Sequence, residues 1–150
     1  DVKLAPGYTL RGLRRDDWDD CQRIADVLNA AFNRTIHHAA EFHRFATRAP
    51  SFRYELQLVA EAPDGSFAAH VGVNYQPTSR YGVFEPVCTH PAHRQRGLAQ
   101  ALMFDGLHRL AALGAASVTV DTGTAIAANA LYESIGFTEV CRGYLWRRVW

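Results

Sequence analysis

The segment Arg94–Ala99 holds the residues of this sequence whose types and spacing point most directly to chemistry. Arg94 and Arg96 supply two positive charges, and Gly97 lets the backbone come close to a ligand. An amphipathic pattern predicts a helix from Leu98, and the first amides of a helix lack internal partners and carry partial positive charge. An apolar strand that runs into such a turn and helix is typical of an anion site. We therefore predict that this segment binds a phosphorylated ligand, in particular a pyrophosphate.

The pattern of this segment differs from two common phosphate-binding loops. The sequence contains neither Gly-x-x-x-x-Gly-Lys-Ser/Thr nor Gly-x-Gly-x-x-Gly. It contains Arg-x-x-Gly-x-Ala, which resembles the loop of the GNAT family of acetyl-CoA-dependent N-acetyltransferases. The resemblance implies that backbone amides of the loop hold the pyrophosphate of coenzyme A. The coenzyme-binding residues predicted there are Arg94, Gln95, Arg96, Gly97, Leu98 and Ala99.

A second segment, Asn129–Phe137, resembles the Asn-x-x-Tyr-x-x-x-Gly-Phe element of the same family. Asn129 and Tyr132 are three residues apart, so they share one face of a helix. Gly136 suits the left-handed conformation that ends a helix. The resemblance implies that Asn129 lies near the pantetheine arm and that Tyr132 donates a proton to the departing thiolate. Taken alone, the segment also fits an ordinary amphipathic helix with a glycine cap.

The apolar stretch before the loop supplies backbone contacts. By the same resemblance, Val87, Cys88 and Thr89 pair with the pantetheine arm as if it were a further strand, and the amide near Val87 faces the thioester oxygen. Direct transfer of an acetyl group from a thioester to an amine needs no covalent enzyme intermediate, so a nucleophilic side chain is not expected. We interpret Cys88 as a small buried side chain rather than as a nucleophile.

Glu85 is the predicted general base. It lies two residues before Val87, so the two side chains point to the same face of a strand. Its spacing from Arg94 is similar to that of the base glutamate in some aminoglycoside N-acetyltransferases of the family. An alkylammonium must lose a proton before it attacks, and a carboxylate can accept that proton. The alternatives are that Glu85 pairs with a surface arginine, or that the base is a water molecule held by His90.

A histidine-rich segment, His37-His38-x-x-Glu41-x-His43, suggests a metal site at first sight. Its spacing matches neither His-Glu-x-x-His nor His-x-x-Glu-His. On a helix, His37 and Glu41 share a face while His43 points elsewhere. We therefore predict no metal, and a solvated or substrate-facing helix instead, because the corresponding region lines the acceptor pocket in the family.

Periodic patterns give the order of the secondary-structure elements. Tight turns require antiparallel neighbours, whereas a strand–helix–strand crossover requires a parallel pair, so we predict an α/β (α+β) fold with a mixed sheet and helices on both faces. The order resembles the GNAT fold, which implies a mostly antiparallel sheet of about seven strands, splayed between strands 4 and 5 where the coenzyme enters. Strands are predicted at 8–14, 54–62, 67–75, 81–89, 117–121, 137–142 and 144–150, and helices at 17–32, 38–47, 98–113 and 125–135.

Composition limits the class of protein. A chain of 150 residues, 48% of them hydrophobic, matches one domain with a core. A net charge of +1 gives no case for nucleic acid or an anionic membrane surface, and no apolar run approaches the ~20 residues of a membrane span. Residues 1–7 lack the apolar region of a signal peptide. Three widely spaced cysteines, Cys21, Cys88 and Cys141, indicate neither a disulfide framework nor a zinc site, so we expect a reducing cytoplasm.

We predict a single acetyltransferase domain over residues 1–150, and the missing initiator methionine leaves open that it is excised from, or one half of, a longer chain. The predicted function is transfer of an acetyl group from acetyl-CoA to a primary amine of a small molecule or peptide, by direct attack in a ternary complex. The alternative is a catalytically silent acyl-CoA-binding module of a tandem GNAT protein, and the presence of both Glu85 and Tyr132 favours the enzyme. A nucleotide-binding enzyme unrelated to coenzyme A is weakened by the missing phosphate loops. Trp146 and Trp150, on the last predicted strand, suggest an edge-to-edge homodimer.

Overall fold

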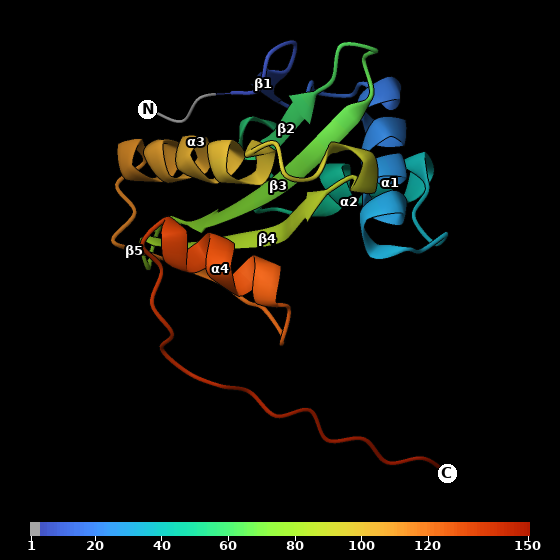
Figure 1. Ribbon diagram of the computed structural model, residues 1–150. Coiled ribbons are helices and arrows are strands. Elements are labelled where there is room, and N and C mark those ends of the chain that lie inside the picture. The colour runs from blue at the N-terminus through green and yellow to red at the C-terminus, as the bar shows by residue number, and fades with distance from the viewer. Residues whose placement is uncertain (1–3) are drawn as a thin grey trace.

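One sheet with the strand order β1-β2-β3-β4-β5 organises residues 4–150, which the computed structural model describes (Figure 1). Residues 1–3, which belong to the segment compared above with a signal peptide, lie outside the described residues. The strands are β1 (Thr9–Gly12), β2 (Gln57–Glu61), β3 (Phe67–Gln76), β4 (Tyr81–Thr89) and β5 (Ser117–Val120). The helices are α1 (Trp18–Phe32), α2 (Ala39–Arg48), α3 (Leu98–Ala112) and α4 (Ile126–Ser134), with short 3-10 turns η1 (Tyr54–Leu56) and η2 (Pro91–His93).

The strand directions follow from the connections. The pairs β1–β2, β2–β3 and β3–β4 are antiparallel, and β4–β5, which is joined through α3, is parallel. This confirms the predicted mixed, mostly antiparallel sheet with helices on both faces. Among residues 4–150, no helix is both long and apolar enough to cross a bilayer.

The prediction of about seven strands is wrong: the described residues form five. The segments 137–142 and 144–150 contain no strand, and in Figure 1 the end of the chain runs away from the sheet. Their alternating apolar residues satisfy the local pattern of a strand. A strand also needs a neighbour for its backbone groups, however, and no described segment pairs with the outer edge of β5. Trp146 and Trp150 are consequently 90% and 94% exposed.

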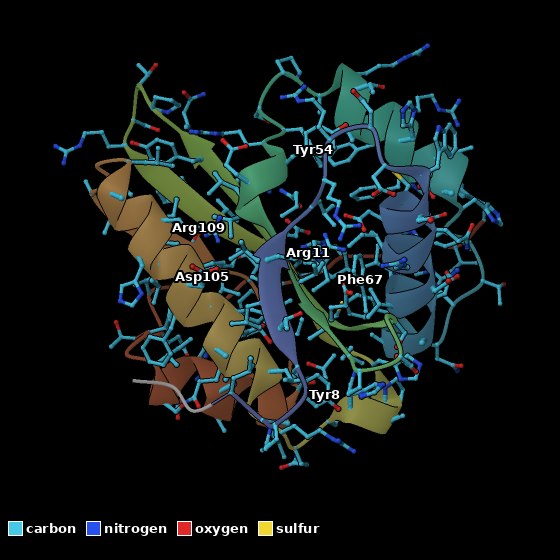
Figure 2. The ribbon with its side chains drawn as sticks, turned by 90° about the horizontal axis from the view of Figure 1, so that it is seen from above. Tyr8, Arg11, Tyr54, Phe67, Asp105 and Arg109 are labelled. Carbon is cyan, nitrogen blue, oxygen red and sulfur yellow. The ribbon has the colours of Figure 1, made fainter. Side chains whose placement is uncertain are left out.

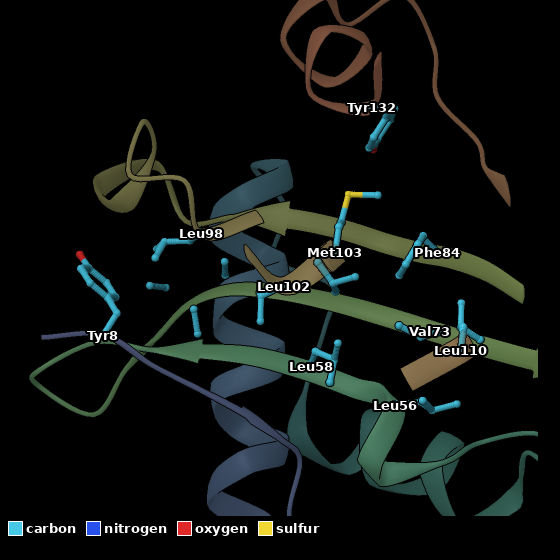
Figure 3. Close-up of a cluster of buried hydrophobic side chains, with 14 of the residues drawn as sticks. Tyr8, Leu56, Leu58, Val73, Phe84, Leu98, Leu102, Met103, Leu110 and Tyr132 are labelled. Atoms are coloured by element: carbon cyan, nitrogen blue, oxygen red, sulfur yellow. The ribbon is translucent and has the colours of Figure 1, made fainter. Parts of the chain in front are cut away.

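Two apolar clusters cover the two faces of the sheet. One lies under α3 and α4 and contains Leu102, Met103 and Tyr132 together with β-strand residues such as Phe84 (Figure 3). The other lies under α1 and α2 and includes Ile24, Val59 and Cys88. Because both faces are covered, nearly every residue of β3 is buried, rather than every second one.

Helix α1 is anchored to β1 by a buried ion pair. Both Arg11 terminal nitrogens lie 2.7 Å from the two carboxylate oxygens of Asp20, which is 1% exposed, and Arg11 Nε donates to Glu61 at 2.9 Å. Figure 2 shows Arg11 beside Phe67, and the guanidinium lies 5.1 Å from that ring centre. Burial alone would raise the pKa of the Asp20 carboxyl, but the hydrogen bonds from Arg11 and the Arg14 amide outweigh it and lower that pKa. This anchor fixes where α1 crosses the sheet.

The apolar stripe predicted for α1 is only partly buried. Cys21, Ile24 and Leu28 face the core as expected. Trp18 and Phe32, at the two ends of the helix, are 54% and 41% exposed.

Candidate active site

The edge of β4 that faces β5 is free over its last five residues. Pairing with β5 covers Tyr81–Phe84 only, and within residues 4–150 no strand pairs with Glu85–Thr89 on that side. On the other side, the His90 amide donates to the Ala68 carbonyl at 2.8 Å. Backbone groups alternate between the two sides of an antiparallel strand, so Val87 and Thr89 turn theirs toward the free edge. This opening lies between strands 4 and 5, where the splay was predicted.

A bulge places Glu85 at the start of this free edge. The register between β3 and β4 runs from Val71↔Val87 to Val73↔Phe84, so β4 contains one extra residue here. Gly72 lies opposite, and a Cβ atom on it would come 2.3 Å from the Glu85 carbonyl oxygen. Only glycine at residue 72 therefore permits the bulge that exposes the Glu85 side chain. The prediction that Glu85 and Val87 share a face is wrong, because the extra residue turns Glu85 to the side of α1 and α2 while Val87 packs against the cluster under α3 and α4.

The turn between β4 and α3 has the backbone of an anion site. Gln95 and Gly97 both have left-handed φ angles, 62° and 72°. Gly97 is the N-cap of the 15-residue helix α3, and no atom lies within 4 Å of where its Cβ would be. The amides of Leu98 and Ala99 precede the first intrahelical bond, which runs from Ala101 to Gly97. Unpaired amides, a helix dipole and open space meet at this point.

The two arginines of the turn are held by the protein itself. Arg94 donates to the carbonyl of Ala31 in the last turn of α1 at 3.2 Å and to the carbonyl of Thr89 at 3.4 Å. Arg96 donates to the Tyr8 hydroxyl at 2.8 Å. In this structure Arg94 therefore ties the turn to α1, and Arg96 ties it to the segment before β1.

Tyr8 links this turn to η2. Its hydroxyl lies 2.8 Å from Nδ1 of His93 as well as from Arg96. Burial, together with the neighbouring His90 and Arg96, lowers the pKa of His93, so the ring is neutral at pH 7 and its Nδ1 shares a hydrogen bond with the Tyr8 hydroxyl. Sequence reasoning missed Tyr8, because 85 residues separate it from His93 and no local pattern connects them.

The helix α4 carries the other two predicted site residues. Tyr132 is buried, points toward Met103 in Figure 3, and lies in the cluster under α3 and α4. Burial raises the pKa of the Tyr132 hydroxyl, which keeps it protonated at neutral pH. Asn129 donates to the carbonyl of Gly123 at 3.4 Å and so braces the segment before the helix.

Cys88 and His90, two further residues considered for the site, make contacts within the protein. Cys88 has its backbone turned to β3, and burial raises the pKa of its thiol to about 12, so the thiol stays protonated at neutral pH. The ring of His90 accepts the Ala92 amide at 3.2 Å and caps η2. The Cys88 thiol is therefore not a nucleophile at neutral pH, and only Nδ1 of His90 is engaged in the cap.

A pocket of about 560 Å³ lies on the other face of the sheet, between α1, α2 and strands β2–β4. Among the predicted site residues, only Glu85 lines this pocket. Tyr132 belongs to the cluster under α3 and α4, so the two predicted catalytic groups approach β4 from opposite faces. The free edge of β4 lies between them.

The sequence analysis overlooked His70, which lines this pocket from β3 and is 1% exposed. Its Nδ1 lies 3.1 Å from the Leu58 carbonyl, which can only accept, so Nδ1 carries the proton. Burial lowers the pKa of His70 to about 4, so the ring is neutral at pH 7 and keeps a lone pair on Nε2. A histidine within the apolar run Phe67–Tyr75 was the available signal.

The histidine-rich segment lies at the pocket wall. His37 Nδ1 lies 3.5 Å from the Glu41 carboxylate, as their spacing predicted, while the ring of His43 stacks on Trp18 with a centroid distance of 4.5 Å. In the part of the chain that the structure describes, no three His, Cys, Asp or Glu side chains are grouped as metal ligands.

Comparisons with known proteins agree with this architecture. Residues 14–137 match the profile of the acetyltransferase (GNAT) family. Similar structures include a GCN5-related N-acetyltransferase from Sphaerobacter thermophilus (TM-score 0.73, 20% identity, 91% of this chain and 45% of that one). Another is a Trypanosoma brucei acetyltransferase (TM-score 0.72, 20% identity, 94% of this chain and 99% of that one). A third is a Brucella melitensis GNAT acetyltransferase in complex with acetyl-CoA (TM-score 0.65, 23% identity, 88% of this chain and 83% of that one). No curated protein sequence matches.

The chain belongs to the GNAT acetyltransferase family, because the family profile covers most of its length. It spans less than half the length of the Sphaerobacter thermophilus protein and nearly all of the Trypanosoma brucei one.

Proposed function

We propose that this protein is an N-acetyltransferase that moves the acetyl group of acetyl-CoA to a primary amine of a small molecule or peptide, by direct attack in a ternary complex. The observation that carries the proposal is the free edge of β4. It connects an anion site at Gly97 with a pocket that contains Glu85. A coenzyme on one side of the sheet and an amine on the other would meet there.

The residues present fit coenzyme A. The amides around Gly97 suit its pyrophosphate, and the outward backbone groups of Val87 and Thr89 suit the amides of its pantetheine arm. When bound, acetyl-CoA supplies the acetyl group as a reactive thioester. Of the two arginines, Arg94 contributes by positioning the turn, and its charge adds to the field at the anion site.

Two side chains move protons in this proposal. Glu85 lines the pocket beside the free edge and removes a proton from the acceptor ammonium, directly or through one water molecule. Tyr132 is protonated at neutral pH because burial raises its pKa, and it donates that proton to the departing sulfur. Tyr132, which donates a proton, and Glu85, which removes one, thus lie on opposite sides of the reacting groups.

Release of free thiol from acetyl-CoA in the presence of primary amines tests the proposal. We expect amine-dependent thiol release and no labelled protein after incubation with radiolabelled acetyl-CoA alone, since no covalent intermediate is needed. Binding of acetyl-CoA without thiol release for any amine would instead support the silent acyl-CoA-binding module. Absence of acetyl-CoA binding would contradict both.

Two further proposals concern the setting of the protein. The described cysteines are all free thiols, which supports a reducing compartment such as the cytoplasm. The exposed aromatic residues Trp146 and Trp150 support association of two copies through the C-terminal segment. Light scattering tests the second proposal: we expect a dimer that becomes a monomer in the variant Trp146→Ser/Trp150→Ser.

A further inference from the structure

We infer that the acceptor is a monoamine on an apolar body the size of an aromatic ring, and not a polycation such as an aminoglycoside or a polyamine. The inference rests on the proposed function, because it concerns the acceptor pocket of that reaction. It follows from the different chemistry of the two pocket walls and from the number of charges between them.

The wall formed by the helices is mostly apolar, and Glu41 of α2 is its one charged residue. Ala25, Leu28 and Phe32 come from α1, and Phe42 and Phe45 come from α2. The rings of Phe42 and Phe45 lie 6.3 Å apart and both contact Phe52, which holds the aromatic surface in place. Such a wall suits a flat apolar group better than the many hydroxyl groups of a sugar.

The wall formed by the sheet is polar. Its polar residues are Gln57, His70, Asn74 and Glu85, and Pro86 is the one apolar residue that β4 adds. Glu85 is the one carboxylate of this wall. Because the His70 ring is neutral, Glu85 is also the one charged group there, and it provides the negative charge for an ammonium group. The amine of the acceptor therefore points to the strands, and its body lies against the helices.

The charges in the pocket balance a single ammonium. The lining contains two carboxylates, Glu41 and Glu85, and one guanidinium, Arg34, so with its histidines counted as neutral its net charge is −1. Within residues 4–150, Glu85 has no ion-pair partner, and neither has Arg34, whose guanidinium lies over Phe32 at 5.2 Å from the ring centre. A polycation would place further positive charges near Arg34, in a pocket whose net negative charge offsets only one of them.

The volume agrees with a small acceptor. A pocket of about 560 Å³ lies within the ~300–1,000 Å³ of typical small-molecule sites. It accommodates a phenyl ring on a short alkylamine chain and leaves room for water beside Glu85.

A comparison of three amines tests the inference. 2-Phenylethylamine, spermidine and kanamycin A are compared as acceptors by thiol release. Their binding is also measured by calorimetry with coenzyme A present, which permits binding but no acetyl transfer. We expect kcat/KM for 2-phenylethylamine to exceed that of both polycations by at least ~10-fold, and its affinity to rank first. The binding measurement decides the acceptor class even if no amine is acetylated, so failure of the proposed function is distinguishable. Tighter binding or faster acetylation of either polycation, or no binding of 2-phenylethylamine, would overturn the inference.

A set of matched variants locates the binding surface. Phe32→Ala removes a ring that is 41% exposed and lines the pocket, whereas Leu113→Ala changes an apolar residue of similar exposure, 36%, after α3. We expect Phe32→Ala to weaken binding of 2-phenylethylamine about fivefold and to leave coenzyme affinity unchanged. Phe32→Leu should recover most of the loss, and Leu113→Ala should have no effect. Equal effects of the two alanine variants would overturn the inference.

Discussion

The side of the sheet proposed for the coenzyme and the pocket proposed for the acceptor are built in opposite ways. On the coenzyme side, the free edge of β4, the turn and the start of α3 come from the contiguous residues 85–99. The acceptor pocket takes its lining from α1, α2 and three strands, over residues 25–86. One side is therefore encoded locally, and the other exists only after the helices have packed on the sheet.

This difference separates what the family shares from what distinguishes its members. An anion site made of backbone amides needs glycine and a helix start, and a short motif specifies both. A pocket made of side chains from separate elements depends on how those elements pack. We therefore expect substitutions on the coenzyme side to act on binding of acetyl-CoA and substitutions in the pocket to act on the acceptor.

The largest effect is expected from Gly97→Glu. A side chain and a negative charge would enter the anion site, so acetyl-CoA affinity should fall by ~10²-fold or more, as measured by calorimetry. The control is Gly114→Glu, since Gly114 also has a positive φ, 83°, and open space around its Cβ position, but lies beyond the other end of α3. Unchanged affinity in Gly97→Glu, or equal loss in the control, would contradict the assignment.

Tyr132→Phe should lower kcat by ~10²-fold, the usual size of a general-acid contribution. Coenzyme affinity should change little because the ring remains in the core. Tyr75→Phe is the matched control: Tyr75 is also buried, but its hydroxyl donates to the Leu113 carbonyl at 3.0 Å. A steady-state comparison in which both variants retain the wild-type kcat would remove Tyr132 from the mechanism.

Glu85→Gln should lower kcat/KM at pH 7 by roughly 30-fold, less than a full general-base contribution because water can replace the carboxylate. The loss should shrink as the pH approaches the acceptor pKa near 10, where the amine is already neutral. Glu41→Gln, in the same pocket, controls for the change of charge. If Glu85→Gln keeps the wild-type acid limb of the pH profile, the base is another group.

The smallest effect is expected from Asp20→Asn, and it concerns the stability of the fold. Loss of the charged hydrogen bonds to Arg11 should lower the free energy of unfolding by about 2 kcal/mol at pH 7, while Asp19→Asn, on the exposed side of α1, should change it little. Because α1 carries part of the pocket wall, the acceptor KM should rise more than the coenzyme Kd. Equal stability of Asp20→Asn and Asp19→Asn in urea would contradict this role.

The pH dependence of stability follows from the same pair. The pKa of Asp20 is lower in the folded protein than in the unfolded chain, so its contribution is complete above about pH 4. It is lost as the pH falls through the folded pKa, where the unfolded chain binds the extra proton. Urea titrations of wild type and Asp20→Asn should therefore converge in acid.

Elements with a strong local signal were predicted well. The strand at 81–89 and the start of α3 at Leu98 agree with the structure. The helix at 38–47 is displaced by one residue, and the first part of the strand predicted at 54–62 is the turn η1. Apolar spacing, turns and caps act over a few residues, so they can be read from the sequence.

The partners of side chains and strands could not be read in this way. Arg94 and Arg96 were predicted to add positive charge at a phosphate site, and the sequence did not indicate that they also bond to α1 and Tyr8, which lie more than 60 residues away. The last two predicted strands have the apolar alternation but no neighbour to pair with. In both cases the deciding contact is distant in sequence.

The sequence by itself determined the glycine turn that opens α3, the order of helices and strands, and the family to which they point, because each depends on neighbouring residues. Only the tertiary structure decided that Gly72 makes room for the bulge at Glu85, that His70 is neutral and faces a pocket, and that Glu85 and Tyr132 approach β4 from opposite faces. The physical reason is that these properties arise from burial and close packing between separate elements, which no local pattern records.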